Sequence, residues 1–72
     1  MFDEKIFAQR LATARTALHL SQRQLAFRIG VSPRAVGQFE QTSSVPSVPT
    51  LVALADVLDC SLDWLTGRTD HR

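Results

Sequence analysis

Arg34 and Gln38 carry side chains that can recognise nucleic-acid bases, and their spacing of four residues places them on one face of a helix. A guanidinium group can bind the O6 and N7 atoms of guanine with two hydrogen bonds, and a carboxamide can bind the N6 and N7 atoms of adenine similarly. Ser32, Pro33 and Gln41 would share the same polar surface. This segment therefore predicts a surface that reads base pairs in the major groove.

Other chemistry finds little support in the sequence. Glu40 has no second carboxylate at a spacing suited to acid–base catalysis. Cys60 has no histidine at the spacing of a nucleophilic pair or a zinc site. We therefore expect no enzymatic activity, no metal site and no cofactor.

The charges are divided unevenly along the chain, although the net charge is only +1. From Lys5 to Phe39 there are six cations and no acid, whereas from Glu40 to Arg72 there are five acids and two arginines. A positive first half favours a polyanionic partner. Duplex DNA is the polyanion that the base-recognition residues fit.

Length and composition predict one small domain. The chain has 72 residues, of which 44% are hydrophobic, enough for a packed core. No apolar run is long enough to cross a membrane, and the residues after Met1 do not form a signal segment. A single cysteine cannot form an internal disulfide, so the sequence favours a cytoplasmic protein.

The hydrophobic pattern predicts an all-α fold, a compact five-helix bundle without strands. Phe7, Leu11, Ala14 and Leu18 have the spacing of one helical face, and Asp3 is suited to cap this first helix. The remaining four helices should follow along the chain.

A serine marks the predicted start of each later helix: Ser21, Ser32, Ser47 and Ser61. Gln24 follows the first of these at the spacing of a capping box. Pro33 follows the second and suits the first position of a helix over residues 33–40. We expect residues 1–67 to form the domain and residues 68–72 to fray.

The second and third helices are predicted to cross closely. Ala26 is small enough for the contact, and Gly30 supplies the positive φ of a sharp turn. The apolar seam would consist of Leu25, Ile29, Val31, Val36 and Phe39. Such a pair is a helix-turn-helix, in which the third helix enters the major groove and the second lies across it.

These residues resemble the helix-turn-helix of lambdoid phage repressors and Cro proteins and of the bacterial Xre-like group. The resemblance rests on Leu20-Ser21-Gln22, Leu25-Ala26, Gly30-Val31-Ser32, Phe39-Glu40, Pro46-Ser47, Leu51, Leu54-Ala55, Leu58 and Ser61-Leu62-Asp63-Trp64-Leu65. It covers about Phe7 to Gly67. It implies a transcriptional regulator, most economically a repressor, that binds a palindromic DNA operator as a homodimer.

The resemblance also implies roles for single residues. Base-contacting positions correspond to Arg34 and Gln38, with Ser32 and Pro33 near the groove edge. The expected DNA-backbone contacts are Gln22, Arg23, Gln41 and Ser43. Arg15 and Glu40 match positions that form an ion pair between the first and third helices.

The sequence departs from the family pattern at three places that bear on this surface. Pro33 removes a side chain that often hydrogen-bonds a base, and Gly37 weakens the third helix by about 1 kcal/mol relative to alanine. Thr42 stands where glycine usually follows that helix, which puts the contacts of Gln41 and Ser43 in question.

A second interpretation makes the chain a protein-interaction module, such as an antitoxin, whose main partner is another protein. Phe27 supports it, because the corresponding position of the resembling family is usually polar. Trp64 fits either the core or a dimer or partner contact. Under this interpretation, substitution of Phe27 would release a protein partner, whereas under the first, substitution of Arg34 would abolish selective DNA binding.

Overall fold

Hydrogen-bonded caps fix where four of the five helices begin. In this computed structural model, which describes residues 1–72, the helices are α1 (Glu4–Ala17), α2 (Gln22–Ile29), α3 (Ala35–Glu40), α4 (Val48–Leu58) and α5 (Leu62–Leu65), and there is no strand. The side chains that accept the capping hydrogen bonds belong to Asp3, Ser21, Ser47 and Ser61. The predicted all-α fold with five helices is confirmed.

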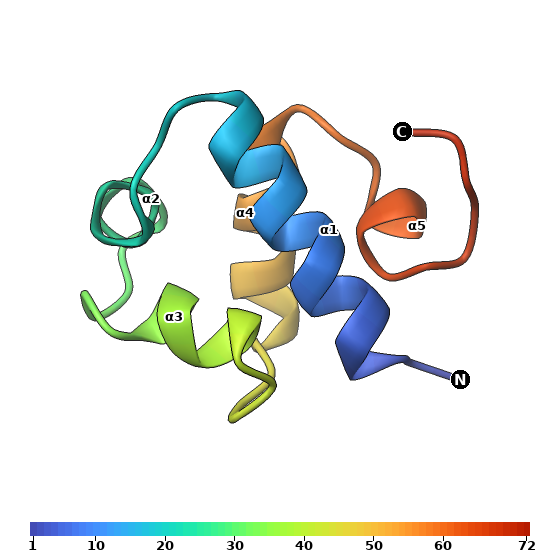
Figure 1. The fold of residues 1–72 in the computed structure, drawn as a ribbon, viewed down its shortest axis with the longest axis horizontal. Coiled ribbons are helices and arrows are strands. Elements are labelled where there is room, and N and C mark those ends of the chain that lie inside the picture. The colour runs from blue at the N-terminus through green and yellow to red at the C-terminus, as the bar shows by residue number, and fades with distance from the viewer.

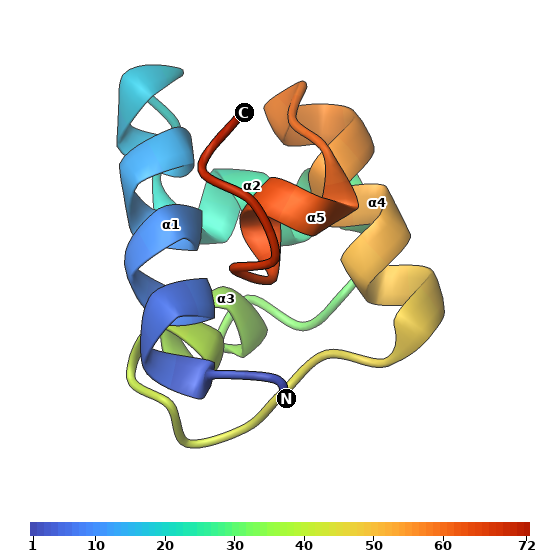
Figure 2. The same cartoon turned by 90° about the vertical axis from the view of Figure 1, so that its right-hand side faces the viewer.

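The core lies between α1 and α4, and the shorter helices close it from either side. In Figure 1, α2 and α3 lie to the left of α1, α5 lies to its right, and α4 passes behind it. Figure 2, turned by 90°, separates α1 from α4 and shows α5 between them. All five helices contribute to one cluster of 13 buried hydrophobic side chains. None of the helices is long and apolar enough to cross a lipid bilayer.

Leu18 departs from the predicted core face of the first helix. It is 45% exposed, whereas Phe7, Leu11 and Ala14 are buried. The reason is that α1 ends at Ala17, so that Leu18 no longer continues the helical face. His19 then adopts the left-handed conformation, with φ of 57°, and turns the chain toward α2.

The segment predicted as a helix over residues 33–40 is a turn followed by a shorter helix. Ser32 does not cap it: α3 begins at Ala35, and no side chain caps its start. The Ala35 N–H donates to the Ser32 carbonyl at 3.0 Å, which closes a tight turn around Pro33. Because the Ser32 carbonyl is hydrogen-bonded to the N–H three residues ahead rather than four, the α-helical pattern begins only at Ala35.

Thr42 ends α3 in the place that glycine usually takes. Its φ is 60°, and the next N–H, of Ser43, donates to the Gln38 carbonyl at 2.9 Å. This is the hydrogen-bond pattern of a left-handed helix end, although a β-branched residue is strained in that conformation. The exit from α3 therefore follows the glycine-type geometry despite the substitution.

The tail of residues 68–72, which we expected to fray, makes several contacts with the domain. The Arg10 guanidinium donates to the Thr69 carbonyl at 2.6 Å, and the Ser61 N–H donates to the Arg72 carbonyl at 3.0 Å. The Arg72 guanidinium also lies 4.9 Å from the centre of the Trp64 ring. These contacts join residues far apart in sequence, so the local composition of the tail does not reveal them.

Candidate nucleic-acid interface

The turn between α2 and α3 brings two helices together at a buried alanine. Ala26 is fully buried, and Gly30 ends α2 with φ of 74°. Leu25, Val36 and Phe39 are buried in the same cluster. The apolar faces of both helices thus point inward, and the polar face of α3 is left for solvent.

A shallow hollow on the outside of α3 gathers most of the predicted DNA contacts. It is lined by Gln22, Pro33, Arg34, Gly37, Gln38 and Gln41, which we call the recognition surface. Arg34 and Gln38 are both exposed. The three other predicted contacts, Ser32, Arg23 and Ser43, are exposed but lie outside the hollow.

Gln22 links the start of α2 to the end of α3. Its Nε2 donates to Glu40 Oε1 at 3.0 Å. An amide nitrogen carries two N–H groups, so this bond leaves one of them free to donate outward. The sequence predicted a backbone contact for Gln22 but not this partner, because the two residues are 18 positions apart.

The ion pair expected between Arg15 and Glu40 is present and joins α1 to α3. Arg15 Nε lies 2.6 Å from Glu40 Oε2, and Nη2 lies 3.1 Å from Oε1. The remaining nitrogen, Nη1, donates to the Leu20 carbonyl at 2.8 Å. The hydrogen bond with Glu40 raises the pKa of the Arg15 guanidinium, against the lowering effect of burial. This pair therefore fixes the end of α3 against α1.

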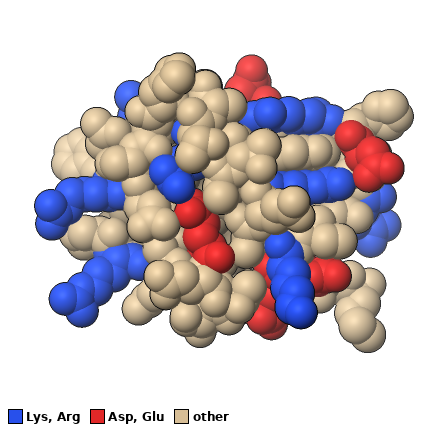
Figure 3. Space-filling view, viewed as in Figure 1, with Lys and Arg blue, Asp and Glu red and all other residues tan.

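Basic side chains project from the side of the molecule that carries α2 and α3. In Figure 3, lysine or arginine side chains extend beyond the left edge, where Figure 1 places these helices, and no acidic side chain reaches that edge; other basic side chains lie on the right, among most of the acidic ones. α2 itself has no acid in its first turn and Arg28 in its last. A polyanion approaching this side meets a positive surface around the recognition surface.

The comparison with known families agrees with this geometry. A family model described as helix-turn-helix matches residues 11–65, which include the whole recognition surface. The chain belongs to the helix-turn-helix family. The match is to a family of regulators rather than of enzymes.

Similar helix-turn-helix proteins include phage repressors, in agreement with the resemblance found in the sequence. The cryptic phage CTXphi transcriptional repressor RstR of Vibrio cholerae is 38% identical over 60 residues, which are 83% of this chain and 54% of RstR. The chain thus spans about half the length of this relative.

Two solved structures have the same fold. The P22 c2 repressor in complex with a synthetic operator gives a TM-score of 0.80 at 33% identity, covering 83% of this chain and 91% of that chain. The restriction-modification controller protein C.AhdI from Aeromonas hydrophila gives 0.80 at 38% identity, covering 88% and 96%.

The two aromatic residues predicted as partner contacts of this helix-turn-helix domain have different environments. Phe27 is 86% exposed on α2, beside Arg23 and Arg28. Trp64 is buried in the core cluster, and the Arg10 guanidinium lies 5.1 Å from the centre of its ring. Trp64 is therefore part of the monomer core, and of the two rings only Phe27 is exposed.

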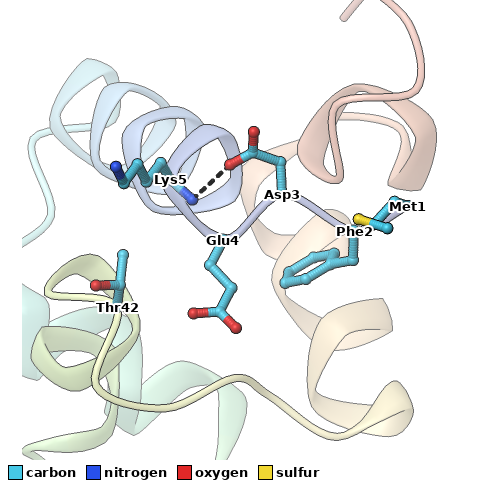
Figure 4. A pocket seen from close by; sticks show the side chains of 6 residues that line it. All are labelled: Met1, Phe2, Asp3, Glu4, Lys5 and Thr42. Atoms are coloured by element: carbon cyan, nitrogen blue, oxygen red, sulfur yellow. Dashed lines mark hydrogen bonds between the residues drawn. The ribbon is translucent and has the colours of Figure 1, made fainter.

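A second hollow at the start of α1 is less suited to nucleic acid. It is lined by Met1, Phe2, Asp3, Glu4, Lys5 and Thr42 (Figure 4). The Asp3 carboxylate accepts the Lys5 backbone N–H at 2.9 Å as the cap of α1. Two acidic side chains at its edge would repel phosphate groups. The recognition surface on α3 is the better nucleic-acid site.

Proposed function

We propose that this helix-turn-helix protein is a sequence-specific double-stranded DNA-binding transcriptional regulator. The observation that carries the proposal is the exposure of Arg34 and Gln38 together on the recognition surface. α3 and the turn before it enter the major groove, and the start of α2 lies against the phosphate backbone. The similarity to the P22 c2 repressor, which was solved with an operator, supports this arrangement.

The exposed residues predicted to contact DNA each have a role in the proposal. Arg34 and Gln38 contact base edges, with Ser32 and Pro33 at the edge of the groove. Residues that contact the DNA backbone are Gln22, Arg23, Gln41 and Ser43. None of these side chains is needed to fill the core.

The regulator acts as a homodimer on a palindromic operator. Each bidentate base contact discriminates by about 1–3 kcal/mol, whereas useful specificity requires about 4–10 kcal/mol. The discrimination provided by two base-reading side chains in one copy reaches only the lower end of this range. A second copy doubles the number of base contacts. Two half-sites about 34 Å apart, one helical turn, fit such a dimer.

Repression by blocking access of RNA polymerase is the simplest mechanism for such a domain. It requires only that the operator overlap a promoter, and no further catalytic or ligand-binding site. We place this activity in the bacterial cytoplasm, on nucleoid DNA, since that is where an operator lies.

Selection of bound sites from random duplexes tests the proposal directly. We expect an enriched palindrome, and affinity that falls steeply with salt because phosphate contacts release counterions. Arg34→Ala should reduce the preference for the selected site by about 10- to 100-fold while the domain stays folded. The matched control is Arg68→Ala, which removes the same charge from the opposite end of the domain, near α5. No enrichment, or equal loss in both variants, would contradict sequence-specific binding.

A protein partner bound through Phe27 is a second candidate, favoured by the 86% exposure of this ring between two arginines. Such a partner would present an apolar side chain flanked by acids. Phe27→Ser should then release a protein that co-purifies with the native chain, and leave affinity for the selected duplex within about twofold. If nothing co-purifies with the native chain, Phe27 is an isolated exposed residue and this candidate fails.

A further inference from the structure

Gly37 occupies the middle of a six-residue helix, where glycine is an unfavourable choice. Alanine at the same position would favour the helix by about 1 kcal/mol. Its φ is not in the left-handed region, so the backbone does not require glycine. The reason for glycine must therefore lie in what surrounds it.

The side chain of Gln22 fills the space beside Gly37. A Cβ atom at Gly37 would stand 3.1 Å from Gln22 Oε1 and 3.6 Å from Cδ. The first of these distances is shorter than an ordinary contact of a Cβ atom. The carboxamide of Gln22 thus lies against the bare backbone of α3.

Glu40 holds the same carboxamide from one turn further along α3. The Gln22 Nε2 donates to Glu40 Oε1 at 3.0 Å, and Glu40 is fixed in turn by Arg15. One side of the carboxamide is therefore positioned by Gly37 and the other by Glu40. With one N–H of Nε2 bound to Glu40, the other is available for an acceptor outside the protein.

We propose that Gly37 is a positioning residue for nucleic-acid binding. Because Gly37 has no side chain, the Gln22 carboxamide can lie against the backbone of α3, a position that we call its seat, and donate an N–H to a phosphate oxygen. The proposal rests on the proposed DNA-binding function. It names the part of the recognition surface that binds the phosphate backbone of DNA. The chemical class bound by Gln22 is a phosphodiester. The base-reading side chains Arg34 and Gln38 lie on the same hollow.

The proposal predicts opposite effects of one substitution on folding and on binding. Gly37→Ala should leave the urea midpoint equal to or higher than that of the native chain, because alanine is the better helix former. The same methyl group must displace the Gln22 carboxamide by a few tenths of an ångström, and we expect this shift to weaken binding to the selected duplex severalfold. The salt dependence of binding should not change, since Gln22 carries no charge that displaces counterions.

A double-mutant cycle distinguishes two causes of weaker binding by Gly37→Ala: displacement of Gln22, and a direct clash of the added methyl group with DNA. Gln22→Ala alone should weaken binding by a similar factor, and Gly37→Ala should add nothing in the Gln22→Ala background. Thr13→Ala, a helix-favouring change at an exposed position of α1, is the matched control and should leave affinity unchanged. If Gly37→Ala binds like the native chain, or weakens binding equally without Gln22, the proposal is overturned.

The side-chain amide resonances of Gln22 test the seat without DNA. Gly37→Ala should move these NMR signals toward the positions of a free carboxamide, as should Glu40→Gln. If the signals move but the native chain binds no duplex, the seat exists and the proposed DNA-binding function fails. If the signals of the folded variant do not move, the seating of Gln22 by Gly37 is refuted whatever the DNA result.

Discussion

Two arginines of α1, five residues apart, hold opposite halves of the molecule. Arg15 binds Glu40 at the end of α3 and the Leu20 carbonyl before α2. Arg10 binds the Trp64 and Thr69 carbonyls, at 2.5 and 2.6 Å, and Asp70 at 3.2 Å. One arginine therefore fixes the half that carries the recognition surface, and the other fixes α5 and the tail.

The two arginines differ in the carboxylates they bind. The Glu40 side chain is 9% exposed and accepts two hydrogen bonds from Arg15, whereas the Asp70 side chain is fully exposed and accepts one from Arg10. An ion pair in water adds little stability because both charges remain solvated and mobile. A sheltered, bidentate pair fixes the relative orientation of its two helices. The partners of a charge, rather than the number of ion pairs, thus determine its role.

The recognition half depends on this pair because its helix is short. α3 has six residues and no side-chain cap, far fewer than an isolated helix needs to be stable in water. Its position comes from Val36 and Phe39 in the core and from Glu40 at its end. The α5 half instead depends on hydrogen bonds from Arg10 to backbone carbonyls, and the exposed Asp70 carboxylate contributes little to it.

Arg15→Met should have the largest effect. It leaves the Glu40 carboxylate sheltered without its cation, a loss of about 3 kcal/mol in the free energy of unfolding. DNA affinity of the folded fraction should fall as well, because Glu40 no longer holds Gln22. Urea denaturation and duplex titration measure the two effects.

The double variant Arg15→Met/Glu40→Leu sharpens this prediction. Replacing both partners removes the unpaired charge, so much of the lost stability should return. Affinity for the selected duplex should stay low, because the double variant also removes the Glu40 carboxylate that accepts from Gln22. Equal stability of the single and double variants would contradict the account of a sheltered carboxylate.

Most of the fold could be predicted from short-range signals. The caps Asp3, Ser21, Ser47 and Ser61 and the left-handed Gly30 act within a few residues, so the sequence displays them directly. The prediction that Ser32 caps the third helix was wrong, because the turn around Pro33 has the same composition as the start of a helix. The geometry there is decided by how α3 packs, not by its first residues.

The contacts that the sequence did not predict, in the candidate site and in the tail, involve long-range partners. The grouping of Arg34 with Gln38 followed from helical spacing alone. The contact of Gln22 with Gly37 and Glu40 joins two helices across a turn, and the contact of Arg10 with the tail spans more than 50 residues. The polar and charged tail is predicted to fray only because its own residues say nothing of distant hydrogen-bond donors.

Arg10→Met should have a smaller effect than Arg15→Met and a different pattern. It removes two charged hydrogen bonds to carbonyls, which is worth about 1–2 kcal/mol. Hydrogen exchange of the Ser61 amide, which donates to the Arg72 carbonyl, should accelerate as the tail loosens. Affinity of the folded protein for the selected duplex should stay within about twofold, because the recognition surface does not touch Arg10. A large loss of affinity would break the division into two halves.

Asp70→Asn isolates the ion pair from the carbonyl contacts of Arg10 and should have the smallest effect. The Asp70 side chain is fully exposed, so we expect the urea midpoint to be unchanged, with Ser61 exchange as in the native chain. The carbonyls of Trp64 and Thr69 still accept from Arg10 in this variant and hold the tail. If Asp70→Asn loosens the tail as much as Arg10→Met does, the carboxylate is the anchor, and the contrast between the two arginines of α1 disappears.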